Sequence, residues 1–156
     1  MSRRIPNHDD PQTVTDMIHT AMQRVPFGQW LGLELTHLTT ERVHVGLKMR
    51  DEFVGNPARN ILHGGIISAV LDTVGGFAAL LGVVAQGRNS NGSDEVSPWL
   101  STIDLRTDFL RPGTGDAFTA EAYPLRVGNR LAVTRMELHN DAETLIAVGT
   151  GTYIIP

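Results

Sequence analysis

The longest apolar stretch of the chain runs from residue 64 to residue 85, and His63 in front of it makes its start read His-Gly-Gly. Its side chains are nearly all apolar or small, and Asp72 is its only charged residue. A helix that is apolar on every side is buried in a protein core or in a membrane. An ionised Asp at the centre of a bilayer costs on the order of 3 kcal/mol. We therefore predict a buried core helix, about 33 Å long, and no membrane span.

Strict alternation of apolar and polar residues predicts strands before this helix. The apolar positions fall two apart in two short pieces, separated near Thr39-Thr40, which predicts a hairpin; they are Leu31, Leu33, Leu35, Val43, Val45 and Leu47. Residues 50–62 contain Gly55, Asn56 and Pro57 and are expected to be a loop.

The chain after the helix also predicts strands. Residues 101–113 alternate, residues 116–140 indicate two strands around a turn at Gly128-Asn129, and residues 143–155 close the sheet. Pro124 is expected at an edge or at a bulge. Strands joined by short turns are antiparallel, and such a sheet can bury one face against a single helix. This pattern predicts an α+β fold, a curved antiparallel sheet wrapped around one central helix. Residues 86–99 are polar and are expected to form a loop.

A short amphipathic helix is predicted at residues 11–24, ended by Pro26. We accordingly divide the chain into an N-terminal helical segment, residues 1–29, and a main domain, residues 30–156. The 156 residues suit one domain. The start of the chain has two arginines but no apolar core after them, so no signal peptide is predicted and the cytoplasm is the expected location.

Composition excludes several classes of function. The net charge of −4 disfavours nucleic-acid binding, and the absence of cysteine excludes disulfides and a Cys nucleophile. The six histidines show no metal-ligand spacing, and there is no G-x-S-x-G motif, P-loop or dinucleotide motif. No cofactor or metal is expected.

The His63-Gly64-Gly65 triplet suits carbonyl binding at a helix start. The first N–H groups of a helix have no internal partner and lie at the positive end of its dipole. Without side chains at Gly64 and Gly65, a substrate carbonyl could approach and be polarised there. The alternative interpretation is a tight turn that only leads into a helix.

Asp72 follows Gly65 by seven residues, or about 10 Å along the helix axis. One carbonyl at Gly65 therefore cannot reach Asp72 of the same helix. If both act on one substrate, two copies of the helix must run antiparallel, which predicts a two-fold dimer with shared sites. The alternative is a buried acid that is merely satisfied by hydrogen bonds.

Three features together resemble the PaaI-type branch of the hotdog-fold acyl-CoA thioesterases, over about residues 30–155. The first is His63-Gly64-Gly65 with an acid nine residues after the His, which is Asp72. The second is the strand from Thr102 that ends in Leu110-Arg111-Pro112-Gly113. The third is the hairpin Gly128-Asn129-Arg130. The resemblance implies a hotdog fold, a homodimer or a dimer of dimers, and hydrolysis of acyl-CoA without metal or covalent cofactor.

The resemblance also implies roles for particular residues. Asp72 would be the general base or the nucleophile, and Gly65 N–H would polarise the thioester carbonyl. His63 would hold the loop and contact the thioester region, beside Gly64. Thr102 matches a position that orients water in some members. Relatives carry Asn or Gln six residues before the His, where this chain has Pro57, so Asn56, or alternatively Asn60, would take that role.

The substrate's other parts would meet other residues. Arg111 and Arg130 would meet CoA phosphates, because guanidinium groups suit phosphate; solvated strand-end charges are the alternative. Small residues along the helix favour an aliphatic medium or long acyl group over an aromatic one. Two other functions stay open: a hotdog module that binds acyl-CoA without turnover, and a hotdog dehydratase or hydratase.

Overall fold

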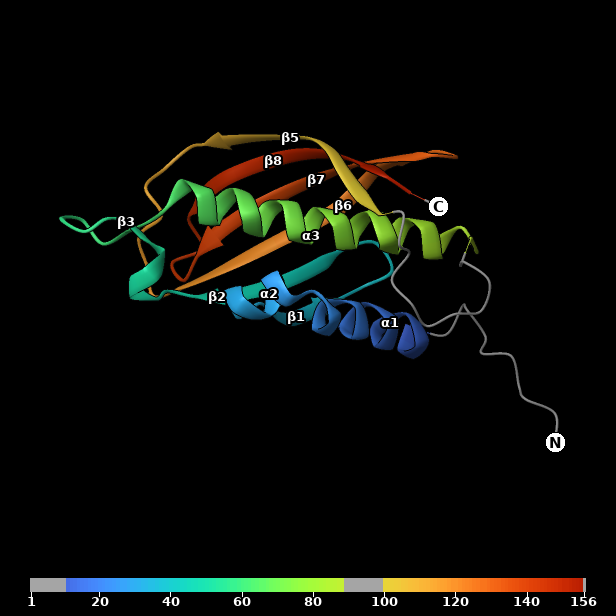
Figure 1. Ribbon diagram of the computed structural model, residues 1–156, viewed down its shortest axis with the longest axis horizontal. Helices are drawn as coiled ribbons and strands as arrows, with labels where there is room; N and C mark the ends of the chain where they lie inside the picture. Colours follow the sequence, from blue (N-terminus) through green and yellow to red (C-terminus); the bar gives the residue numbers. More distant parts are fainter. Residues whose placement is uncertain (1–10, 89–99, 156) are drawn as a thin grey trace.

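The computed structural model describes residues 11–88 and 100–155, and in these the predicted α+β arrangement is confirmed (Figure 1). Six strands form one antiparallel sheet in the order β1-β2-β6-β7-β8-β5. They are β1 Glu34–Leu38, β2 Val43–Lys48, β5 Ser101–Phe109, β6 Ala117–Val127, β7 Leu131–Asn140 and β8 Leu145–Ile154. β1 and β5 are the two edges, and the sheet curves around a single long helix.

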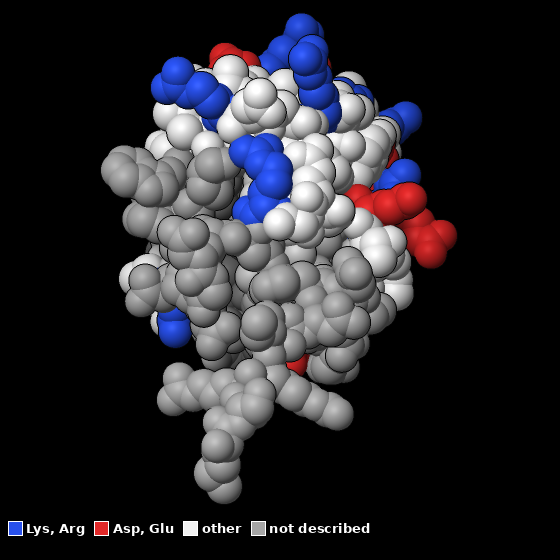
Figure 2. Space-filling model, turned by 90° about the vertical axis from the view of Figure 1, so that its right-hand side faces the viewer, with Lys and Arg blue, Asp and Glu red and all other residues white. Residues whose placement is uncertain are grey.

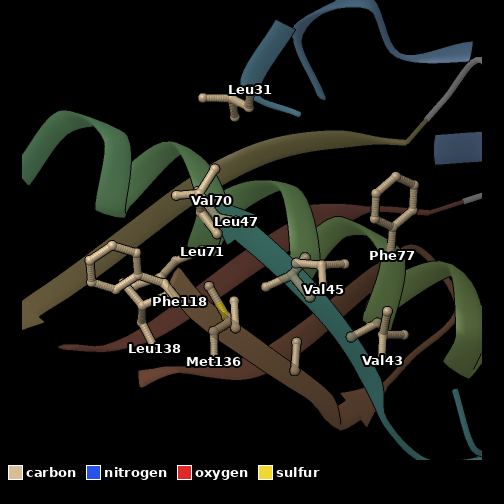
Figure 3. Close-up of a cluster of buried hydrophobic side chains, with 14 of the residues drawn as sticks. Leu31, Val43, Val45, Leu47, Val70, Leu71, Phe77, Phe118, Met136 and Leu138 are labelled. Atoms are coloured by element: carbon tan, nitrogen blue, oxygen red, sulfur yellow. The ribbon is translucent and has the colours of Figure 1, made fainter. Parts of the chain in front are cut away.

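That helix is α3, Gly64–Ala85, with the bounds that the sequence predicted. It packs on the middle strands of the sheet, and its buried side chains join those of β2, β6 and β7 in the main core (Figure 3). α3 is apolar and long enough to cross a bilayer, but 67% of its most apolar window is buried inside the domain. Its hydrophobicity is therefore explained by its place at the centre of the core.

Two N-terminal helices lie along the β1 side of α3 (Figure 1). α1, Pro11–Arg24, has the predicted bounds, and its Ile18 and Met22 are buried. Pro26 was expected to end the first helix, and it also begins a second one, α2, Pro26–Leu31. A proline suits the first turn of a helix, because an N–H group at that position would have no partner within the helix. Leu31, expected in a strand, is therefore the buried end of α2. The division at residues 29 and 30 stays a prediction.

The predicted loop at residues 50–62 is wrong in part. It holds a short 3₁₀ helix, η1, Asp51–Phe53, followed by a small hairpin of β3, Val54–Asn56, and β4, Ile61–Leu62. This hairpin extends beyond the sheet at the start of α3 (Figure 1). β3 has three residues and β4 has two, which is too short for alternation in the sequence to mark them.

The predicted hairpin turns are confirmed, and so is the bulge at Pro124. The register between β6 and β7 shifts between Pro124 and Arg126, and the pairing of β2 with β6 ends at Ala122. The missing N–H of proline therefore interrupts neither ladder. Of the polar 86–99 loop, residues 89–99 lie outside the described part of the chain.

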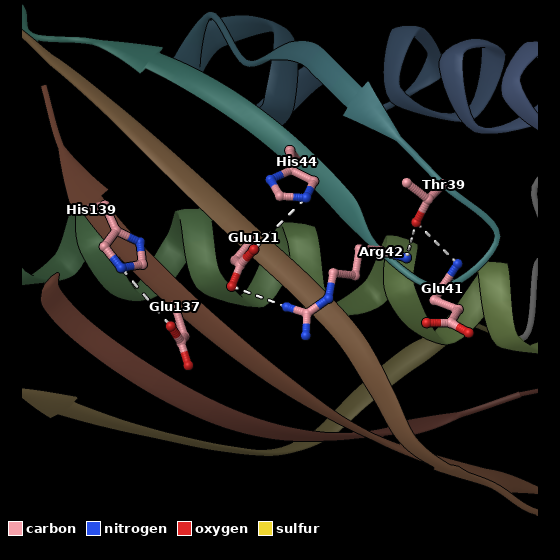
Figure 4. A network of polar contacts seen from close by, with 7 residues as sticks. All are labelled: Thr39, Glu41, Arg42, His44, Glu121, Glu137 and His139. Carbon is pink, nitrogen blue, oxygen red and sulfur yellow. Dashed lines mark hydrogen bonds and ion pairs between the residues drawn. The ribbon is translucent and has the colours of Figure 1, made fainter. Parts of the chain in front are cut away.

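The outer face of the sheet, away from α3, carries histidines and glutamates (Figure 4). His44 Nε2 lies 3.7 Å from Glu121 Oε2, and His139 Nε2 lies 3.9 Å from Glu137 Oε2. No three His, Asp or Glu side chains among the described residues are grouped to hold a metal ion. We interpret these pairs as a polar sheet surface.

Candidate active site

Asp72 lies in the middle of α3 and is half-buried, with its carboxylate turned toward β5 and β8. Its Oδ1 accepts a hydrogen bond from the Thr102 hydroxyl at 2.9 Å and one from the Tyr153 hydroxyl at 3.2 Å. Thr102 and Tyr153 are paired residues on neighbouring strands, so one position of the sheet delivers both hydroxyls. The arrangement fixes the direction of the carboxylate.

Tyr153 is the member of this group that the sequence analysis missed. Its side chain is almost completely buried, and burial together with the Asp72 carboxylate raises the pKa of its phenol well above the usual range. The phenol therefore stays protonated and acts as a hydrogen-bond donor. The signal was a tyrosine in a strand among glycines, since a buried tyrosine hydroxyl needs a polar partner.

Glycines in α3 and β8 make room for the tyrosine. A Cβ atom added at Gly75 would overlap the Tyr153 hydroxyl, and one at Gly151 would come within 2.6 Å of it. The hydroxyl can therefore reach Asp72 only because these two positions have no side chain.

His63 caps the start of α3. Its ring Nδ1 accepts a hydrogen bond from Gly65 N–H at 2.8 Å, and the backbone N–H of His63 donates to the Phe53 carbonyl at 2.7 Å. The donor predicted to polarise a substrate carbonyl is thus already bonded within the chain. Gly64 N–H, the first donor of the helix, has no acceptor among the described residues, and the ring of Phe109 lies against Gly64.

The two asparagines proposed as water-positioning residues lie on the exposed β3–β4 hairpin. Asn56 Oδ1 accepts a hydrogen bond from Ala58 N–H at 3.1 Å, and Asn60 occupies the left-handed backbone region with φ 47°. Both belong to the helix-start end of the molecule. Within one chain, neither is grouped with Asp72.

The two predicted phosphate-binding arginines lie at opposite ends of α3. Arg111 is near the helix start, because Gly113, two residues later, accepts a hydrogen bond from Leu62 N–H. Its guanidinium donates to the Leu145 carbonyl at 3.0 Å. Arg130 lies at the β6–β7 turn, near the other end of α3.

That far end is basic. Arg126 and Arg130 border a shallow hollow at the β6–β7 turn, and the Arg88 guanidinium donates to the Gly128 and Asn129 carbonyls at 2.6 and 2.8 Å. Figure 2 faces this end and shows Lys and Arg side chains gathered over its upper part. Of the arginines at this end, only Arg130 was predicted from the sequence as a phosphate-binding residue.

In one chain the predicted residues therefore form separate groups along α3, with the helix start and Asp72 about 10 Å apart on the axis. The structure brings Asp72 and Thr102 together and adds Tyr153. It does not bring Gly65 to Asp72.

Comparison with known proteins decides the family. The family model described as "Thioesterase superfamily" matches residues 59–147, from the β3–β4 hairpin into β8. This chain belongs to the thioesterase superfamily. The expected hotdog fold and the expected class of enzyme, a thioester hydrolase, are thereby confirmed.

Individual members of the superfamily agree with this assignment. The medium/long-chain acyl-CoA thioesterase YigI of Escherichia coli is 42% identical over 134 residues, which are 84% of this chain and 86% of that protein. A crystal structure from Shewanella oneidensis, related to the thioesterase superfamily, is 40% identical with a TM-score of 0.84, covering 95% of this chain and 100% of that one. A thioesterase family protein from Silicibacter pomeroyi, with 23% identity and a TM-score of 0.72, shares the fold over 90% of this chain and 96% of its own.

Proposed function

We propose that this thioesterase hydrolyses medium- and long-chain acyl-CoA thioesters to the free acid and CoA, with Asp72 as the catalytic carboxylate. The observation that carries the proposal is the half-buried Asp72 carboxylate, oriented by Thr102 and Tyr153 in the core helix of a superfamily member. The substrate class is suggested by the Escherichia coli relative, which matches over most of both chains.

The proposed site is shared between two chains. Two α3 helices run antiparallel, so that Asp72 of one subunit faces the helix start of the other. The two-fold axis then passes near Ser68 and Ala69, midway between Gly65 and Asp72, and their small side chains suit close helix contact. Two protomers would thus form two equivalent sites; a dimer of dimers is also compatible with this interface.

The β5 edge supports such a dimer. β5 ends the sheet, so one side of its backbone has no partner strand within residues 11–88 and 100–155. Three large apolar residues on or after it are about half exposed: Ile103 (54%), Phe109 (56%) and Leu110 (48%). An edge strand with exposed apolar side chains favours association with another chain. Phe109 also contacts Gly64, which connects this edge to the helix start.

At the helix start, we propose that the thioester carbonyl accepts a hydrogen bond from Gly64 N–H. It also accepts from Gly65 N–H, either in place of the His63 ring nitrogen or together with it. Both donors lie at the positive end of the α3 dipole, which stabilises the oxyanion of the tetrahedral intermediate. The imidazole of His63 would then lie beside the thioester. Asn56 or Asn60 could position water only from the partner's hairpin.

Two routes use the same carboxylate. As a general base, Asp72 takes a proton from water, the hydroxide forms a bond to the carbonyl carbon, and the C–S bond breaks to release CoA thiolate, which takes up a proton. As a nucleophile, Asp72 itself forms the new C–O bond and releases the thiolate, and water then cleaves the anhydride. After one turnover in water labelled with heavy oxygen, label in Asp72 would establish the second route with water attacking the Asp72 carboxyl carbon, because the first route leaves both Asp72 oxygens unlabelled.

A panel of acyl-CoA esters, followed by detection of the free thiol, tests the function. We expect hydrolysis by the wild type and a loss of about 100- to 10,000-fold in kcat for Asp72→Asn. Glu41→Gln, at an exposed acid in the β1–β2 turn and away from the β5 edge, is the matched control. Full activity in Asp72→Asn would exclude the mechanism. Failure of the wild type on every ester would favour a module that binds acyl-CoA without turnover.

A further inference from the structure

A cavity of about 280 Å³ lies between the N-terminal helices and α3, apart from the thioester chemistry described above. Its apolar walls come from four elements, α1, α2, the start of β1 and α3, and comprise Met22, Gly28, Leu33, Leu35 and Phe77. Met22 and Phe77 are buried, and Figure 3 shows the Phe77 ring standing away from α3. The polar residues His19, Gln23, Gln29 and Glu34 also line the cavity.

The cavity borders the turn of α3 that carries the proposed catalytic carboxylate, on the face of the helix that is turned toward α1 and α2. Thr73, which directly follows Asp72, lines it, and Phe77 lies one turn further along the same face of α3. The Thr73 hydroxyl already donates to the Ala69 carbonyl at 2.8 Å, so it needs no polar partner in the cavity. The Asp72 carboxylate turns toward β5 and β8, about 100° around the helix axis from Thr73, so a chain attached to a carbonyl at Asp72 would pass over the outer face of α3 to enter the cavity.

The size and chemistry of the cavity select its occupant. Ligand pockets usually measure about 300–1,000 Å³, so this one holds part of a substrate and not a CoA nucleotide. The acyl chain is the only apolar part of an acyl-CoA ester, and each methylene removed from water strengthens binding roughly fourfold.

We infer that this cavity binds the far end of the acyl chain, and that the N-terminal helices thereby set the preferred chain length. The inference rests on the proposed function and adds a specificity pocket to it. Gly28 is a key position, because a Cβ atom there would meet only Val25, at 3.9 Å. A larger side chain can thus be built into the pocket wall without backbone strain.

Binding of non-hydrolysable S-alkyl-CoA thioethers tests the pocket without depending on turnover. Calorimetry would compare S-dodecyl-CoA with S-butyl-CoA on the wild type, Gly28→Leu and Leu33→Ala. We expect the dodecyl thioether to bind more tightly than the butyl one. We also expect Gly28→Leu to reduce this ratio of affinities at least about tenfold, because it excludes two or more methylenes from the pocket.

Leu33→Ala enlarges the cavity and is expected to shift the preference from the dodecyl thioether toward a longer hexadecyl thioether. Phe27→Leu, on the same helix but outside the cavity wall, is the matched control and should keep the wild-type ratio. Equal binding of both thioethers by the wild type, or a ratio that neither wall variant changes, would overturn the inference. The hydrolysis assay of the proposed function is independent of these binding measurements. Failure of the pocket would change only thioether binding, and failure of the proposed function would change only hydrolysis.

Discussion

The Tyr153 hydroxyl lies within hydrogen-bond distance of two oxygens of Asp72, the main-chain carbonyl at 3.0 Å and carboxylate Oδ1 at 3.2 Å. The single phenolic hydrogen is shared between these two acceptors. The Thr102 hydroxyl donates a further hydrogen bond to Asp72 Oδ1 at 2.9 Å. The catalytic carboxylate of the proposed mechanism is thus fixed from β5 and β8 and not only by its own helix.

Tyr153→Phe removes this donor and keeps the ring. Because a hydrogen bond to a charged group contributes about 1.5–3 kcal/mol, we expect kcat to fall roughly 10- to 100-fold, with KM little changed. The unfolding free energy should fall by about 1 kcal/mol. Steady-state kinetics with one acyl-CoA and thermal unfolding measure the two effects. An unchanged kcat would show that Thr102 alone orients Asp72.

Gly75→Ala should disturb the same contact from the helix side. The added methyl overlaps the Tyr153 hydroxyl and lies 3.0 Å from Met136, so we expect a destabilisation of about 1–3 kcal/mol and a lower kcat. Combining it with Tyr153→Phe should give less than the sum of the two losses in stability, because the clash partner is gone.

The neighbouring Gly76 provides the control. A Cβ atom there meets Tyr153 only at 3.7 Å, so Gly76→Ala should keep kcat and stabilise the helix by roughly 0.5–1 kcal/mol. Chemical denaturation of the four variants gives the comparison. Equal effects at both glycines would contradict a specific contact with the Tyr153 hydroxyl.

The His63 cap can be separated from any chemical role of His63. His63→Ala loses the acceptor of Gly65 N–H and should lower the unfolding free energy by about 0.5–2 kcal/mol, whereas His63→Asn should retain most of it, since Asn is a good helix cap. Denaturant titration measures both variants. If His63→Ala and His63→Asn lower the unfolding free energy equally, His63 does not stabilise the protein by capping α3.

The shared site predicts complementation between inactive chains. Asp72→Ala and Gly65→Pro are each expected to be inactive, but their mixed dimer has one intact site, with Asp72 from one chain and the helix start from the other. Random exchange of subunits should restore up to about one quarter of the wild-type activity. Lack of recovery, once mass spectrometry has shown that mixed dimers form, would rule out a site shared in this way.

His44 makes stability depend on pH. Burial lowers its pKa more than the Glu121 carboxylate raises it, and His37 and Arg42 on the same face also lower it. The native state therefore disfavours protonated His44, so stability present above about pH 6.5 is lost as the pH falls below that value. The unfolding temperature of His44→Gln should fall less between neutral and mildly acidic pH than that of the wild type. Parallel curves for the two proteins would exclude this contribution.

Local patterns in the sequence were sufficient for most of the elements. The apolar run of α3, the alternation in β2 and β5 to β8, and the turn at Gly128-Asn129 each depend on neighbours in sequence, and their bounds followed closely. The lone Asp72 was conspicuous for the same reason, because an isolated charge in an apolar helix is costly without a purpose. The β3–β4 hairpin escaped prediction because its strands of three and two residues are too short to leave an alternating pattern.

Only the tertiary structure decided which side chains meet. Tyr153 lies 81 positions from Asp72, and their contact depends on the registers of β5 and β8 and on the two glycines that make room for the phenol. The cavity under α1 and α2 likewise depends on how helices from one end of the chain pack against the middle of α3. Periodicity determines which face of an element is buried. What that face touches is decided by packing over long sequence separations, and periodicity does not encode it.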